Sequence, residues 1–100
     1  MTHLERVLAA LDIYATSLLV GLKGTNRPTD RRDYEGRLSG VGIIYATLRT
    51  GRVEDAMSRA SSEAHATGWG YLEGPAGEQA EQAFGAFYAE LQSFAREDPR

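Results

Sequence analysis

The chain has no cysteine, only three prolines, two histidines and one tryptophan among its 100 residues. The absence of cysteine excludes disulfides, thiolate catalysis and cysteine-ligated zinc sites. Neither sign of charge dominates, because 11 basic residues face 14 acidic ones and the formal net charge is −3. A share of 42% hydrophobic and 25% charged residues is typical of a globular chain. The length therefore predicts one domain that spans residues 1–100.

A long hydrophobic run is also missing. The longest one, residues 13–22, contains Thr16 and Ser17, and it is shorter than the roughly 20 apolar residues that a membrane-spanning helix needs. A secretory signal would need a positive segment ahead of this run, whereas Arg6 is offset by Glu5. The sequence therefore predicts a cytoplasmic protein.

Hydrophobic residues recur at spacings of three and four residues, which mark one face of an α-helix, in four segments of the chain. The expected core-facing residues are Leu4, Leu8, Leu11, Ala15, Leu18 and Leu22, then Tyr34, Leu38, Val41, Tyr45 and Leu48 with Ile44 on the same face, then Val53, Met57, Ala60 and Ala64, and finally Ala80, Phe84, Phe87, Leu91 and Phe94. Four amphipathic helices joined by short loops predict an all-α fold, a small antiparallel bundle of about four helices.

Local signals place the ends of these helices. Thr2 and Glu5 have the spacing of a capping box. Gly24 is expected just past the end of the first helix, and Thr29 or Asp30 is expected to cap the second. Gly51 is expected to end the second helix.

Three glycines lie inside the second helical segment, at Gly36, Gly40 and Gly42. Each costs about 1 kcal/mol relative to alanine in a helix interior. Two interpretations stay open. Gly36 and Gly40 share a face that another part of the backbone approaches closely, or residues 36–42 form a kink or break between two shorter helices.

Charge is distributed unevenly along the chain. Residues 25–52 hold six arginines against three carboxylates, whereas residues 53–100 hold three arginines against nine carboxylates. The acidic half predicts a surface that docks on a basic protein partner, and acidic surfaces of this kind gain mainly association rate and specificity. The residues predicted to contact the partner are Glu54, Asp55, Glu63, Trp69, Tyr71 and Glu73. The competing interpretation is that the carboxylates are solvated helix faces and that the two aromatic residues seal one end of the core.

A cluster of arginines suggests nucleic-acid binding as an alternative, through Arg27, Arg31, Arg32 and Arg37. Internal ion pairs with Asp30, Asp33 and Glu35 compete with this interpretation. Ion pairing is favoured, because the pI is near 5.3 and nucleic-acid-binding domains of this kind are normally basic.

No catalytic or metal-binding pattern is found. The two histidines, His3 and His65, do not have the spacing of a helical metal site. Ser61 and His65 are adjacent on a helix, but Asp55 is too far around that helix to complete a triad. The sequence therefore predicts a protein that is not an enzyme and needs neither cofactor nor metal ion.

Taken whole, the chain from MTHLERVLAALDIYATSLLVGLKG to EQAFGAFYAELQSFA resembles small single-domain proteins of phages and mobile elements. Among these it is similar to helical anti-CRISPR proteins that act on type I surveillance complexes. The resemblance rests on size, acidic balance, helical pattern and the lack of cysteine and of a catalytic set. It implies a bacterial cytoplasm, a basic ribonucleoprotein partner and inhibition by blocking target DNA. The alternatives are a nucleic-acid-binding regulator and a self-associating helical adaptor that dimerises through its glycine-bearing helix.

Overall fold

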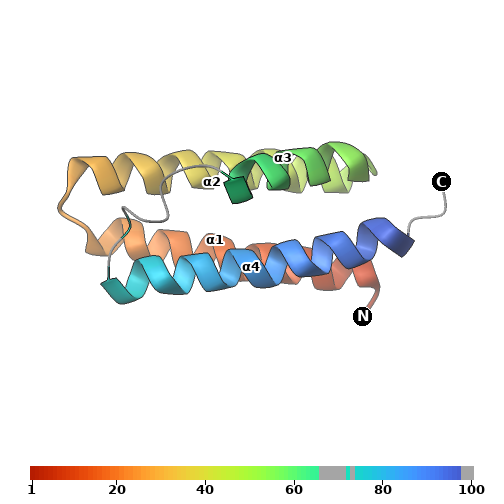
Figure 1. The fold of residues 1–100 in the computed structure, drawn as a ribbon, viewed down its shortest axis with the longest axis horizontal. Helices are drawn as coiled ribbons and strands as arrows, with labels where there is room; N and C mark the ends of the chain where they lie inside the picture. The colour runs from red at the N-terminus through yellow and green to blue at the C-terminus, as the bar shows by residue number, and fades with distance from the viewer. Residues whose placement is uncertain (66–71, 73, 98–100) are drawn as a thin grey trace.

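The computed structural model describes residues 1–65, 72 and 74–97. The described residues form four helices, α1 (His3–Gly24), α2 (Pro28–Arg49), α3 (Val53–His65) and α4 (Gly74–Glu97). Figure 1 shows two layers, with α1 beside α4 in one and α2 beside α3 in the other. Successive helices run in opposite directions, which confirms the predicted all-α antiparallel bundle.

Two of the predicted helix ends are confirmed. The backbone N–H of Glu5 donates to Thr2 Oγ1 over 3.1 Å, and the backbone N–H of Thr2 donates to Glu5 Oε1 over 2.7 Å. This reciprocal capping box satisfies two donors that the start of a helix leaves unpaired, and it lowers the pKa of Glu5. After α2, Gly51 has a φ of 78°, a left-handed conformation that glycine adopts without steric cost.

The two other predicted ends differ from the structure, by one residue at the end of α1 and by two or three at the start of α2. Gly24 belongs to α1, and Thr25 in an extended conformation is the C-cap. The second helix begins at Pro28, with Arg27 as its N-cap and no side-chain capping bond. Proline suits this first position because its missing N–H would be unpaired there and its φ is already helical.

The core lies where α1 and α4 face the other two helices. It contains the predicted aromatic and leucine positions of α4, and Phe84 meets Tyr14 of α1 edge-on, with 5.2 Å between ring centroids. The largest fully buried side chains are Tyr14, Phe87, Leu11, Leu18, Ile44, Leu48, Leu91 and Val7. The periodicity of α1 and α4 therefore identified the correct faces.

The buried face of α2 is rotated relative to the prediction. Tyr34, Ile44 and Leu48 are buried as predicted. Leu38 and Val41 are only partly buried and Tyr45 is 46% exposed, whereas Arg37 is buried. The physical reason is that α2 packs against both α1 and α3, so the centre of its buried face lies between these two neighbours. The prediction of Tyr45 as a core residue is corrected accordingly.

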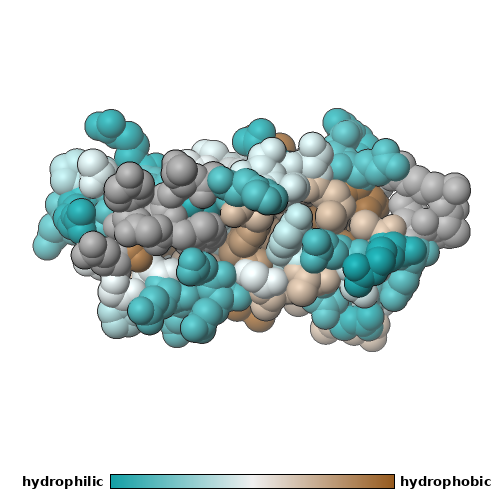
Figure 2. All heavy atoms as spheres, viewed as in Figure 1, coloured by the Kyte–Doolittle hydropathy of each residue, from teal (hydrophilic) through white to brown (hydrophobic). Residues whose placement is uncertain are grey.

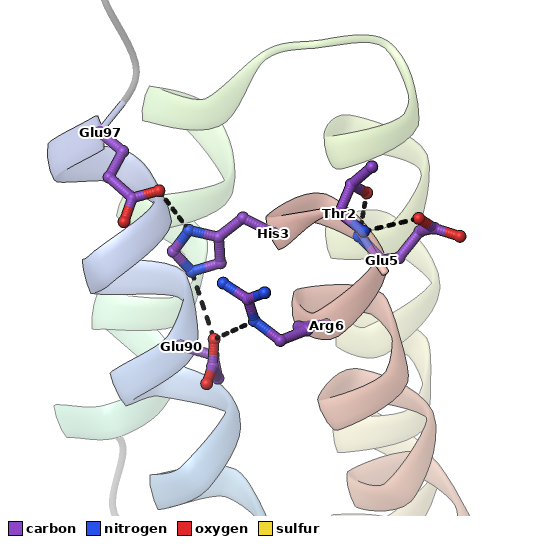
Figure 3. A network of polar contacts seen from close by, with 6 residues as sticks. All are labelled: Thr2, His3, Glu5, Arg6, Glu90 and Glu97. Atoms are coloured by element: carbon purple, nitrogen blue, oxygen red, sulfur yellow. Dashed lines mark hydrogen bonds and ion pairs between the residues drawn. The ribbon is translucent and has the colours of Figure 1, made fainter.

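At the end of the bundle where α1 begins and α4 ends, polar contacts join these two helices (Figure 3). The ring of His3 lies between two carboxylates, with Nε2 3.2 Å from Glu90 Oε2 and Nδ1 in hydrogen-bond contact with Glu97. Arg6 approaches the same Glu90 oxygen at 4.0 Å. These contacts, together with an edge-on contact between His3 and Phe94, hold the N-terminal end of α1 against α4.

One helix among the described residues, α1, is long and apolar enough to cross a membrane by length and composition. The sequence expectation considered only residues 13–22 and so underestimated this helix. Its apolar character has a role inside the bundle, because Val7, Leu11, Tyr14 and Leu18 form part of the core.

Two glycines of α4 provide a matched test of the packing. A Cβ at Gly77 would overlap the backbone carbonyl of Leu72, whereas a Cβ at Gly85 would have no neighbour within 4 Å among the described residues. We expect Gly77→Ala to lower the free energy of unfolding by about 1–3 kcal/mol through overpacking. Gly85→Ala should raise it by up to about 1 kcal/mol through helix propensity. Urea unfolding followed by circular dichroism measures both, and equal stabilisation by the two variants would contradict the close approach at Gly77.

Candidate functional site

A charged cleft of about 350 Å³ lies between α2 and α3. It brings Arg32 and Arg37, from the predicted nucleic-acid-binding set, together with Glu63, from the predicted partner-binding set. The cleft is lined by Arg32, Asp33, Gly36, Arg37, Gly40, Arg59, Ser62 and Glu63. Residues that the sequence assigned to two different surfaces therefore share one site.

The inner wall of the cleft is a network of hydrogen bonds and ion pairs that connects three helices. The Tyr14 hydroxyl of α1 donates to Glu63 Oε1 of α3 over 2.7 Å. Arg37 Nη1 of α2 lies 3.7 Å from the same carboxylate oxygen. Arg37 Nε also donates to Asp33 Oδ2, one helical turn earlier, over 3.3 Å. The guanidinium of Arg37 is thus placed between two carboxylates.

This network is shielded from solvent. The side chains of Arg37 and Glu63 are only 5% and 11% exposed. Burial raises the pKa of Glu63, and the Tyr14 hydrogen bond and the charges of Arg37 and Arg59 oppose this rise. Burial also raises the pKa of Tyr14, with a further contribution from the negative charge of Glu63. Tyr14 is therefore a neutral donor at physiological pH.

Glycine lets α3 approach α2 at this point. A Cβ at Gly40 would lie 3.1 Å from Glu63 Oε2, closer than ordinary van der Waals contact. The kink or break is wrong, because α2 is one continuous helix from Pro28 to Arg49. The predicted close approach of backbone is not found either, since the atoms near Gly40 belong to the Glu63 side chain. Gly36 lies one turn earlier, and a Cβ there would meet nothing within 4 Å among the described residues, so the cleft is open above it.

The sequence analysis did not identify Tyr14, Asp33 or Arg59 as members of a site. A signal for the inward position of Glu63 was present. Val53, Ala56 and Ala60 are the buried residues of α3, and Glu63 follows them at the next helical spacing. Its carboxylate accepts a hydrogen bond inside the protein instead of pointing to solvent.

Of the other predicted partner-contact residues, Glu54 and Asp55 lie outside the cleft. Glu54 and Asp55 are exposed in the first turn of α3, where Asp55 accepts a 2.8 Å hydrogen bond from Arg52 Nε. Trp69, Tyr71 and Glu73 lie outside the described residues. A docking surface built from these residues together with Glu63 stays a prediction.

The four predicted nucleic-acid-binding arginines divide into two kinds. Arg37 is buried in the network, and Arg27 Nε lies 3.8 Å from Asp30 Oδ2, so internal ion pairing holds for these two. Arg31 and Arg32 are exposed and make no ion pair with any residue the structure describes.

Among residues 1–65, 72 and 74–97, no group of three or more His, Asp and Glu side chains is arranged to hold a metal ion. His65 is exposed, and its Nδ1 lies 2.8 Å from the backbone carbonyl of Ser61. The serine and histidine that are adjacent on α3 therefore meet through the backbone and not through the serine hydroxyl.

A second concave surface, the α1–α2 groove, lies on the other side of α2. It has a volume of about 580 Å³ and is mainly apolar. It is lined by Met1, Glu5, Leu8, Ala9, Leu11, Asp12, Ala15, Val41, Gly42 and Tyr45. Arg49 lies over the Tyr45 ring, 5.7 Å from its centroid, and donates to its hydroxyl over 3.2 Å, which fixes the position of this ring. Figure 2, drawn from the direction of Figure 1, shows further hydrophobic surface between more hydrophilic residues.

Variants of Glu63 test the buried network. Because the pKa of Glu63 is raised in the folded state, the folded protein holds more protons than the unfolded chain above pH 4.5. The free energy of unfolding should therefore fall as pH rises from 4.5 through the folded pKa. Glu63→Gln keeps an acceptor for Tyr14 and should remove this slope.

Glu63→Ala instead removes the acceptor and should lower stability by about 1–3 kcal/mol at neutral pH, because buried donors lose their partner. Urea unfolding at a series of pH values measures both effects. A Glu63→Gln variant with the same pH slope as the wild type would show that Glu63 does not titrate as the structure implies.

Comparison with known proteins gives no relative from which a function is inferred. No family model matches the chain, and neither curated proteins nor solved structures match it. The fold class therefore rests on the structure, and the function has to be argued from the two surfaces on either side of α2.

Proposed function

We propose that the protein is a non-enzymatic inhibitor that binds another protein through the α1–α2 groove in the bacterial cytoplasm. The observation that carries this proposal is the composition of the groove. Its lining is mainly apolar, and its charged side chains, Glu5 and Asp12, are both carboxylates. An apolar floor with an acidic edge fits a partner that presents apolar side chains flanked by lysine or arginine.

Large apolar residues remain exposed along this groove. Met1 is 84% and Tyr45 46% exposed. Burial of apolar surface stabilises an interface by about 25 cal/mol per Å². Tyrosine is enriched among the residues that dominate binding energy, and the contact with Arg49 already holds the Tyr45 ring in place. A partner therefore meets a preformed anchor.

Gly42 adds to this argument. It lines the groove within α2, and a Cβ there would meet no described residue within 4 Å. Glycine costs about 1 kcal/mol relative to alanine in a helix, and no close approach inside the bundle explains it, unlike Gly40. The missing side chain widens the groove for an occupant.

The acidic edge is available for a basic partner. The capping box lowers the pKa of Glu5 and keeps it ionised, and Asp12 is exposed with no ion pair to the residues described here. Channels that hold nucleic acid are lined by lysine and arginine. Together with the resemblance to anti-CRISPR proteins, this leads us to propose a type I CRISPR surveillance complex as the partner, with target DNA binding blocked.

The experiment measures target DNA binding by purified type I surveillance complexes of several subtypes with and without the protein. We expect the wild type to raise the apparent Kd for DNA of at least one complex. Asp12→Lys combined with Tyr45→Ala should weaken this inhibition by about tenfold or more, because an anchor and a favourable charge are lost together. Glu81→Lys, a charge reversal at an exposed site on α4, should leave it unchanged.

Other outcomes would contradict the proposal in distinguishable ways. Unchanged DNA binding in every complex would exclude this class of partner. If Glu54→Lys abolishes the inhibition and the groove variant retains it, the partner binds at the start of α3 and not in the groove. A salt-sensitive shift of free DNA or RNA, abolished by Arg31→Gln and Arg32→Gln, would favour the nucleic-acid alternative. If the protein is a dimer in solution and Tyr45→Ala makes it monomeric, the occupant of the groove is a second copy of the chain.

A further inference from the structure

We propose that the charged cleft between α2 and α3 binds a phosphoryl dianion, either inorganic phosphate or a phosphate monoester, between Arg32 and Arg59. This site lies on the other side of α2 from the α1–α2 groove and does not depend on the proposed function. The ligand class follows from the geometry of the cleft and from the ion pairs that its charged side chains already make inside the protein.

The two arginines come from different helices and line the same hollow. Arg32 belongs to the second turn of α2 and Arg59 to the middle of α3, and both side chains are exposed. Between them, Gly36 leaves the helix surface bare, and a Cβ there would have no neighbour within 4 Å among the described residues. Ser62 adds a hydroxyl donor to the lining. A bound anion is thus reached by guanidinium groups from both helices.

The carboxylates of the cleft are already engaged inside the protein. Asp33 accepts from Arg37 Nε, and Glu63 accepts from Tyr14 and lies beside Arg37 Nη1. Arg32 and Arg59, in contrast, make no ion pair with the residues that the structure describes. The carboxylates are paired with the buried guanidinium of Arg37. The exposed guanidinium groups of Arg32 and Arg59 therefore keep hydrogen-bond donors for a ligand from solvent, although the charge of Arg59 also acts on Glu63.

The phosphoryl group is the anion that fits this arrangement. The planar guanidinium fork forms paired hydrogen bonds with phosphate oxygens, and the lining, with three arginines against two carboxylates, has a net positive charge. A volume of about 350 Å³ lies at the lower end of the range of small-molecule sites, which begins at about 300 Å³. A phosphate with a small organic group on one oxygen therefore suits the hollow.

The test follows the backbone amide NMR signals of α2 and α3 while inorganic phosphate is added at constant ionic strength, with chloride as the replaced anion. We expect saturable shifts at the residues that line the cleft. Arg32→Gln and Arg59→Gln should each weaken binding by about tenfold, because a charge-assisted hydrogen bond is lost. Arg31→Gln is the matched control, since Arg31 is an exposed neighbour of Arg32 outside the lining, and it should change the Kd by less than about twofold.

A second variant separates the cleft from general charge attraction. Gly36→Leu fills the hollow without changing any charge, and the open space at Gly36 lets the fold accept it. It should abolish the saturable shifts. Retained binding in this variant, equal losses in all three arginine variants, or no saturation with the wild type would each overturn the proposal.

The source of the phosphoryl group is resolved by titrating phosphoserine and a mononucleotide beside inorganic phosphate. Tighter binding of a monoester assigns the site to the ester, and equal or weaker binding assigns it to free phosphate. Asp12→Lys combined with Tyr45→Ala should leave phosphate binding unchanged. Failure of the phosphate site is therefore distinguishable from failure of the proposed inhibitor function.

Discussion

The hydrogen bond from Tyr14 to Glu63, beside the guanidinium of Arg37, is the polar contact on which the arrangement of three helices depends. Removing charged groups from water is costly unless they are paired and hydrogen-bonded. Here Glu63 pairs with Arg37 of α2 and accepts from Tyr14 of α1, so α1, α2 and α3 are joined at one place. The position of Glu63 near the end of α3 also matters, because α3 has 13 residues and α2 has 22. The short helix covers only part of α2 (Figure 1), and the cleft forms along the part of α2 near this contact.

The two concave surfaces have opposite chemistry because they lie on opposite sides of α2. Toward α1, this helix presents Val41, Gly42 and Tyr45 to a mainly apolar groove whose charged side chains are acidic. Toward α3, it presents Arg32 and Arg37 to a charged cleft. A small bundle thus presents a charged concave surface and a mainly apolar one on two sides of the same helix.

Much of the fold could be predicted from the sequence, because α1 and α4 follow simple physical rules. Their hydrophobic spacings identified Leu11, Leu18, Phe87 and Leu91 correctly, and the capping box at Thr2 fixed the start of α1. The end of α1 could not be predicted in the same way. Gly24 continues the helix in the structure, because a glycine tolerates a left-handed cap but does not require one.

The candidate site could not be predicted, because a hydrophobic pattern assumes that charged residues face water. Arg37 and Glu63 both occupy buried positions on their helices, so a pattern of apolar residues places the buried face of α2 at Leu38, Val41 and Tyr45 instead. That rotation is the cause of the error at Tyr45, and it is also the origin of the groove. Because Arg37, paired with Glu63 of α3, occupies part of the buried face of α2, Val41 and Tyr45 lie nearer its edge beside α1, where they line the groove.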